Sequence, residues 1–137
     1  MKTFTILKPD TLKTRNAGAV ISRLEQEGFR IRAMKMLHLT QAQAEGFYYV
    51  HKERPFFPSL LKFMTEGPVI LMVLEADNAI DKLRKVMGAT DPAKADAGTI
   101  RKQFGTNIER NAIHGSDGPE TAAFEIGYFF NQLEIVG

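Results

Sequence analysis

Cysteine is absent from this sequence of 137 residues. Its absence excludes disulfide bonds, thiolate metal ligands and a cysteine nucleophile, and it fits a reducing compartment. Long hydrophobic runs are also absent. The longest, Val69 to Leu74, is far too short to span a membrane, and the start of the chain carries no long apolar segment. We therefore expect a cytoplasmic protein with no membrane partner.

The sequence also lacks an excess of charge of one sign. Lysine and arginine number 18 against 16 aspartates and glutamates, and both signs are interspersed. A basic tail or stripe, which is typical of nucleic-acid-binding proteins, does not occur, so nucleic acid is not expected as an obligatory partner. No cluster of carboxylates or histidines has the spacing of an all-protein metal cage.

The length and the 44% hydrophobic content predict one domain that spans residues 1–137 and buries a proper core. Apolar or alternating runs predict four strands, and in the longest of them the alternate residues from Phe29 to Leu39 predict a single buried face. The four predicted strands are Phe4–Leu7, Phe29–Leu39, Val69–Leu74 and Ile113–His114.

Apolar residues at helical spacing predict helices between these strands. Thr40 is a suitable N-cap for the second helix. For the last helix, Asp117 is the expected N-cap and Glu120 its partner three residues later. Ala89–Arg110 shows little periodicity and predicts a long functional loop with one helical turn near Ile100–Phe104. The predicted helices run from Ala17 to Gly28, Gln41 to His51, Leu60 to Met64, Ala79 to Met87 and Asp117 to Leu133.

This order of elements is β-α-β-β-α-β with a helical insertion. It predicts an α+β fold, namely a ferredoxin-like α/β sandwich with a four-stranded antiparallel sheet. We expect the helices on one face of the sheet and the long loop before the last strand.

The heptapeptide Asn111–Asp117 is the best candidate for chemistry. His114 sits between a short strand and a Gly-Ser-Asp turn where a helix is about to begin, and helix N-termini favour bound anions. The heptapeptide alone leaves two interpretations open, a solvated surface histidine and a nucleophile beside an anion. His38, on the polar face of a strand, and His51, beside a helix end, are interpreted as structural or surface residues.

Five motifs, in one order along the whole chain, resemble those of nucleoside diphosphate kinases, and the resemblance is especially close to the smaller bacterial members. They are Lys8-Pro9-Asp10, Arg54-Pro55-Phe56-Phe57, Gly88-Ala89-Thr90, Gly98-Thr99-Ile100-Arg101 and the heptapeptide. The resemblance implies a ping-pong reaction, in which the γ-phosphate of ATP or another nucleoside triphosphate passes to a histidine and then to a nucleoside diphosphate.

The resemblance also implies which residues act on the transferred group. His114 is the implied nucleophile, and a neutral imidazole is competent to attack phosphorus. Lys8 reaches the sugar and the transferred group, and Tyr48 donates a hydrogen bond near the γ-phosphate. Glu125 orients the catalytic ring together with Ser116. Outside the family, Lys8 would be interpreted as an edge-strand lysine and Glu125 as a solvated helix residue.

The same resemblance implies the nucleotide site. Arg84, Thr90 and Arg101 hold the phosphates, and Asn111 bonds a ribose hydroxyl. Phosphoryl transfer relies on such fixed positive charge. Outside the family, Arg84 would be a solvated helix residue.

For the base, Phe56 is implied as the stacking platform, with Leu60 and Ile108 closing the slot, whereas Phe57 is interpreted as core. Stacking accepts any aromatic base, so broad specificity is implied. The chain has Ile108 where the family commonly has valine, and Thr11-Leu12-Lys13 also departs from the usual pattern. Neither change touches an implied polar ligand.

Mg²⁺ is the implied cofactor, and it would arrive chelated by the nucleotide phosphates. The family forms dimers that assemble further. Because the chain ends at Gly137, soon after the last helix, we expect a homo-tetramer rather than a hexamer or a dimer. The rival hypotheses are a phosphohistidine hydrolase, a protein-directed phosphotransferase and a nucleotide-binding or nucleic-acid-binding regulator without chemistry.

Overall fold

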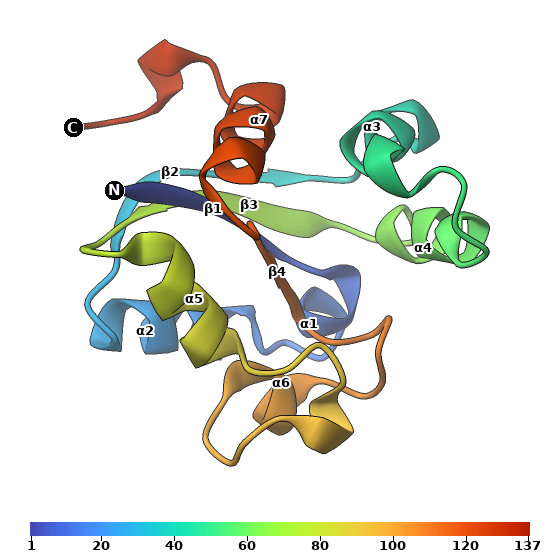
Figure 1. The fold of residues 1–137 in the computed structure, drawn as a ribbon, viewed down its shortest axis with the longest axis horizontal. Helices are drawn as coiled ribbons and strands as arrows, with labels where there is room; N and C mark the ends of the chain where they lie inside the picture. Colours follow the sequence, from blue (N-terminus) through green and yellow to red (C-terminus); the bar gives the residue numbers. More distant parts are fainter.

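A four-stranded antiparallel sheet forms the centre of the computed structural model, which describes residues 1–137 (Figure 1). Its strands lie in the order β2-β3-β1-β4, and every neighbouring pair is antiparallel. This arrangement confirms the predicted ferredoxin-like α+β topology. The strands are β1 (Lys2–Leu7), β2 (Arg30–Leu37), β3 (Val69–Glu75) and β4 (Ile113–Gly115).

All of the predicted helices are present with shifted ends, and one further helix was not predicted. Thr40 caps α3 as expected, because its Oγ1 accepts a hydrogen bond from the N–H of Gln43 and its own N–H donates to Gln43 Oε1. None of the helices combines the length and the apolar character that crossing a membrane requires. The helices are α1 (Pro9–Lys13), α2 (Ala17–Gln26), α3 (Gln41–Phe47), α4 (Phe57–Met64), α5 (Ala79–Met87), α6 (Ile100–Phe104) and α7 (Pro119–Phe129).

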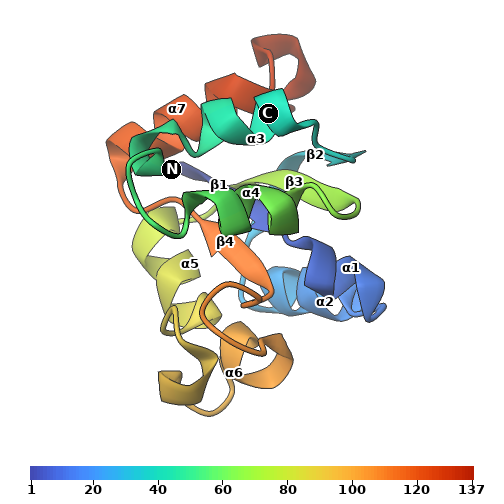
Figure 2. The same cartoon turned by 90° about the vertical axis from the view of Figure 1, so that its right-hand side faces the viewer.

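The helices cover both faces of the sheet, so the expectation of one covered face is wrong (Figures 1 and 2). In the core on one face, residues of α2 and α5 pack against Leu7, Ile70 and Met72. In the core on the other, residues of α3, α4 and the end of α7 pack against side chains that include Ile6 and Leu71. An unbroken apolar strand such as β3 is what two covered faces require.

Strand β2 contains a bulge that the alternating pattern did not reveal. Ile31 pairs with Leu74 and Ala33 with Val73, which leaves Arg32 as an extra residue. Ile31, before the bulge, therefore packs against the core beside α2 and α5, whereas Ala33 and Leu37, after it, contribute to the core beside α7. The predicted single buried face of this strand is wrong for that reason.

Two helix starts also differ from prediction. Pro9 begins a short helix, α1, that was not predicted, although proline is favoured at the first helical position. Helix α7 has Gly118 rather than Asp117 as its N-cap. The N–H groups of both residues donate to Thr121 Oγ1, so Thr121 does what was expected of Glu120.

Candidate active site

His114 lies on β4, an edge strand of the sheet, where it pairs with Ile6 of β1. Its Nε2 donates a hydrogen bond of 2.9 Å to Glu125 Oε1 on α7. Ser116 Oγ donates to the same carboxylate oxygen at 2.7 Å. The hydrogen bond to Glu125 occupies one ring nitrogen, and Nδ1 remains without a protein partner. The predicted trio of His114, Ser116 and Glu125 is therefore brought together.

Aromatic rings fix the plane of this imidazole. Phe47 meets it edge-on, with ring centroids 5.4 Å apart, and Tyr48 does so at 6.3 Å. The Tyr48 hydroxyl is buried and has no hydrogen-bond partner. Burial raises the pKa of Tyr48, so this hydroxyl keeps its proton and can donate it in a hydrogen bond.

Lys8 and Asn111, the two implied sugar contacts, touch each other directly. Lys8 Nζ donates to Asn111 Oδ1 at 2.8 Å, and Asn111 Nδ2 donates to the Thr90 carbonyl at 3.0 Å. Burial is the main cause that lowers the pKa of Lys8 to about 8, and the positive charge of Arg101 is the second. The lysine at the end of β1 is thus a buried cation that loses its proton at a lower pH than an exposed lysine does.

Two arginines supply the remaining positive charge. Arg101 is buried and donates to the carbonyls of Gly88, at 3.1 Å, and Ile113, at 2.8 Å. Burial lowers its pKa to about 10, with a further contribution from Arg84. Arg84 Nη1 lies 2.6 Å from Asp117 Oδ1. This ion pair was not predicted, because Asp117 was expected to cap the last helix.

Asp10 is a second residue whose role was missed. Ala112, two residues before the candidate nucleophile, has a φ of 75°, which is unusual for a residue with a side chain. Asp10 Oδ2 accepts a hydrogen bond from the Ala112 N–H at 3.0 Å, and Thr11 Oγ1 donates one to the Ala112 carbonyl at 2.8 Å. Burial raises the pKa of Asp10. Its place directly after Lys8-Pro9 was the available signal.

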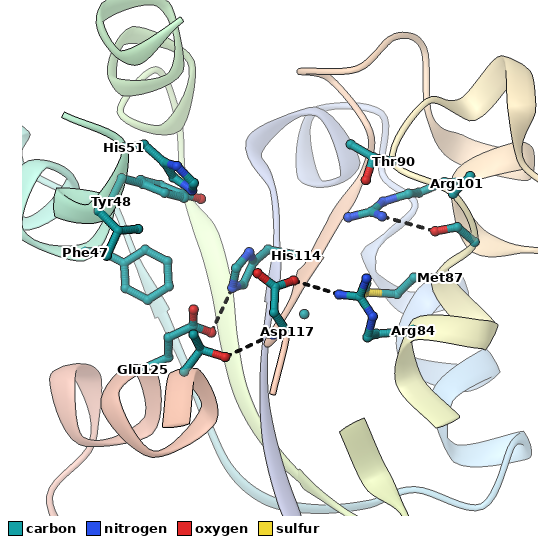
Figure 3. Close-up of a pocket in the computed structure, with 15 residues that line it drawn as sticks. Phe47, Tyr48, His51, Arg84, Met87, Thr90, Arg101, His114, Asp117 and Glu125 are labelled. Carbon is teal, nitrogen blue, oxygen red and sulfur yellow. Dashed lines mark hydrogen bonds and ion pairs between the residues drawn. The ribbon is translucent and has the colours of Figure 1, made fainter. Parts of the chain in front are cut away.

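These side chains surround two adjoining cavities, of about 340 Å³ and about 420 Å³. Figure 3 shows the first, with His114 between Tyr48 on one side and Arg84 and Arg101 on the other. The predicted residues that line it are Tyr48, Arg84, Thr90, Arg101, His114 and Glu125. The second is lined by Lys8, Phe56, Leu60, Ile108 and Asn111, and both share Tyr48, His51, Thr90, Arg101 and His114.

The two cavities differ in character. The first gathers the arginines and the imidazole, whereas the second places Phe56, Leu60 and Ile108 around an apolar slot. Phe56 is 47% exposed and Ile108 is 62% exposed, so both side chains are accessible to a ligand that enters the slot. A charged cavity that opens into an apolar slot can bind an anion at one end and a flat apolar group at the other.

His51 lies beside a helix end, as predicted, but its interpretation as a structural or surface residue leaves out its contact with the site. It lines both cavities, and its ring lies 5.5 Å from that of Phe56, so it is part of the site rather than a remote surface residue. His38, in contrast, bonds the Thr65 carbonyl through Nε2 and lines neither cavity.

Mg²⁺ bound by nucleotide phosphates is compatible with the carboxylates of the first cavity. Asp117 is paired with Arg84, and Glu125 with His114 and Ser116. No group of three potential metal-binding side chains is found.

Comparisons with known proteins agree with one another. The sequence profile of the family "Nucleoside diphosphate kinase" matches residues 1–135. The chain is 59% identical to the nucleoside diphosphate kinase of Desulforapulum autotrophicum over 136 residues, which cover 99% of both chains. It is also 59% identical to that of Geotalea daltonii, over 98% of both chains.

Solved structures give the same result. The nucleoside diphosphate kinase of Aquifex aeolicus superposes with a TM-score of 0.96 at 47% identity, over 98% of each chain. A nucleoside diphosphate kinase from Halobacterium salinarum in complex with CDP also gives a TM-score of 0.96, at 37% identity, over 100% of this chain and 91% of that one. The chain therefore belongs to the nucleoside diphosphate kinase family, enzymes that transfer phosphate between nucleotides through a phosphohistidine intermediate.

Proposed function

We propose that His114 is the residue that carries the phosphoryl group, and that it does so on Nδ1. The observation that supports this best is the hydrogen bond from Nε2 to Glu125, which keeps the proton on that nitrogen and leaves the lone pair of Nδ1 free. The Nδ1–P bond forms as the bond from phosphorus to the oxygen of the leaving nucleoside diphosphate breaks. The ring becomes an imidazolium, and the Glu125 carboxylate stabilises its charge.

The arginines are proposed to hold the phosphates. Arg84 and Arg101 line the cavity beside His114, and Thr90 lies between that cavity and the slot. Arg101 is already fixed by two carbonyls, so little conformational entropy is lost when it binds an anion. The unpartnered Tyr48 hydroxyl is a donor that an oxygen of the transferred group would satisfy.

The ribose and the base are proposed to lie in the second cavity. Lys8 and Asn111 would bond the ribose hydroxyls, and Phe56 would stack on the base, with Leu60 and Ile108 on the other side. Stacking contributes affinity for every base, which supports broad specificity. Mg²⁺, when bound to the phosphates, would neutralise part of their charge during transfer.

The test is transfer of label from ATP labelled in its γ-phosphate. The native protein is expected to take up a label that is lost in acid and retained in base, and added nucleoside diphosphate should remove it as triphosphate. The His114→Ala variant should take up none. His38→Ala is the matched control and should label normally. Label on His114→Ala would contradict the proposal, and label that water but not diphosphate removes would favour the hydrolase.

Assembly and location are proposed as well. We infer that residues 1–137 act as one domain in a homo-tetramer. The edge strand β2 supports self-association, because Met34 and Met36 on it are 54% and 60% exposed. Sedimentation equilibrium would measure the mass of the assembly, and fractionation of cells would test the proposed cytoplasmic location.

A further inference from the structure

The slot proposed to receive the base contains one acidic side chain. Glu109 lines it together with Ile108, opposite Phe56 and Leu60, and no other aspartate or glutamate lines this cavity. An acid at the edge of an apolar slot adds nothing to stacking. It can, however, accept hydrogen bonds from a ligand.

The loop that carries Glu109 has a fixed shape. Asn107 Oδ1 accepts from the N–H groups of Glu109 and Arg110, at 3.1 and 2.8 Å, and the Thr106 N–H donates to the Arg110 carbonyl at 2.7 Å. The Arg110 guanidinium pairs with Glu66 at 2.8 Å and lies over the Phe63 ring of α4. The backbone that aims Glu109 is therefore held by contacts outside the slot.

The Glu109 side chain extends from the loop to α4, which forms the facing wall. Its Oε1 accepts from Ser59 Oγ at 3.1 Å, and Ser59 directly precedes Leu60. No protein donor bonds its Oε2. The carboxylate is half-buried, and its negative charge reaches Lys8, where it partly offsets the lowering of that pKa by burial. A fixed carboxylate with a free oxygen thus lies at the border of the slot.

Resting on the base-binding role proposed for this slot, we propose that Glu109 determines base specificity by accepting hydrogen bonds from the edge of the base. A carboxylate only accepts, so it favours edges that present donors. Guanine presents two adjacent donors, N1–H and the 2-amino group, which match the two oxygens of a carboxylate. Uracil and thymine present one N–H between two carbonyl oxygens, which a carboxylate repels.

Stacking would then allow every base to bind, and Glu109 would rank the bases by the hydrogen-bond donors on their edges. Guanine nucleotides should be preferred, and inosine nucleotides, which lack only the 2-amino group, isolate the contribution of the paired donors. A bidentate contact of this kind typically discriminates by about tenfold or more between bases. We expect kcat/KM for GDP to exceed that for inosine diphosphate by roughly tenfold in the native protein.

The experiment measures discharge of the phosphorylated enzyme by GDP, inosine diphosphate and UDP, and the Kd of the same diphosphates for the unphosphorylated enzyme. In Glu109→Gln the amide oxygen still accepts from Ser59, while the amide nitrogen replaces one acceptor. The ratio of GDP to inosine diphosphate should fall towards one, and UDP should improve. Ser59→Ala, the matched control, removes the contact with α4 but leaves the carboxylate, and should keep the preference for GDP.

Three results would overturn the proposal. These are a native protein with equal kcat/KM for GDP and inosine diphosphate, a Glu109→Gln variant with an unchanged ratio, and equal losses for every diphosphate in both variants. The last result would mean that Glu109 only braces the loop. Failure of the proposed function would look different, because no phosphorylated enzyme would form with any triphosphate.

Discussion

Glu125 Oε1 lies 2.9 Å from His114 Nε2, and this contact links the final helix to the proposed nucleophile. Replacing Glu125 with glutamine removes the charge that would stabilise the phosphorylated imidazolium. A hydrogen bond to a charged group contributes about 1.5–3 kcal/mol, so kcat should fall by roughly one to two orders of magnitude. Single-turnover labelling of His114 by ATP is the measurement, with little change expected in the Kd of ADP.

Ser116→Ala provides the comparison. It removes the donor that lies 2.7 Å from the same Glu125 oxygen but leaves the carboxylate on His114. The loss in kcat should be several times smaller than that of Glu125→Gln. If kcat falls by the same factor in both variants, the charge of Glu125 does not account for the effect on catalysis.

Lys8 predicts a pH dependence in the alkaline range. Its pKa in the empty site is lowered from 10.5 to about 8, first by burial and then by Arg101. The free enzyme therefore loses this positive charge as the pH rises through about 8, and kcat/KM for nucleotides should fall in the same range, since kcat/KM reports the free enzyme. Lys8→Met should have a lower kcat/KM and lack this descending limb. A limb that persists in the variant would belong to another group.

The same shift affects stability in the opposite direction. The lysine in the unfolded chain holds its proton up to about 10.5, whereas the folded protein releases it near 8. Between these values the unfolded state binds more protons, so the free energy of unfolding rises with pH. The cost of the buried charge is thus fully present below about pH 8 and disappears towards 10.5. In Lys8→Met the contribution of this group to the pH dependence of unfolding, measured in urea between pH 7 and 10, should be absent.

Tyr48 should show that activity and stability conflict at this site. Its buried hydroxyl has no hydrogen-bond partner in the empty cavity. A buried polar group without a partner costs about 1–3 kcal/mol, so Tyr48→Phe should unfold at higher temperature than the native protein. The same change removes a donor proposed for the γ-phosphate and should slow labelling. Calorimetry and labelling on one preparation would test both, and a lower melting temperature would contradict the expectation.

A side chain at Gly88, at the end of α5, should displace the helix that carries Arg101. Gly88 has a φ of 88°, a backbone conformation that is strained for any residue with a side chain. A Cβ at this position would also lie 2.5 Å from Thr99 Oγ1. Thr99 caps α6, which carries Arg101. Gly88→Ala should destabilise the fold by about 1 kcal/mol through its backbone and by about 1–3 kcal/mol more through the clash. It should also weaken ADP binding.

Gly98→Ala is the matched control for that variant. Its φ is 87°, but a Cβ there would meet no atom within 4 Å. Only the backbone cost is expected, with unchanged binding of ADP. Titration calorimetry with ADP and unfolding in urea would compare the two alanine variants directly, and equal ADP affinities would show that the clash does not reach Arg101.

The strands could be predicted well from the sequence, because they depend on local patterns. Val69–Leu74 is apolar throughout, and the heptapeptide holds the candidate nucleophile within a few residues of a helix start. The structure brings the motif residues to two adjoining cavities. These residues were indicated by the resemblance to nucleoside diphosphate kinases rather than by local pattern, and their roles stay predictions.

Features that depend on partners distant in sequence could not be predicted. The bulge at Arg32 is defined by the register of β3, and its consequence is that one alternating pattern serves two cores. Asp117 was taken as a cap because Arg84, its partner, lies on another helix. The edge of the base slot likewise depends on how the loop carrying Glu109 meets α4.

Ala112 connects the two ends of the chain. The Asp10 carboxylate and the Thr11 hydroxyl bond its backbone across 102 and 101 residues of sequence, and Lys8 bonds the neighbouring Asn111 across 103. Contacts of such separation slow folding, because closing a long loop costs conformational entropy. The proposed nucleophile, His114, is positioned by the pairing of β4 with β1. Because the proposed site also includes Glu125, nearly the whole chain must emerge during synthesis before the site exists, and phosphorylation of His114 would report a folded protein.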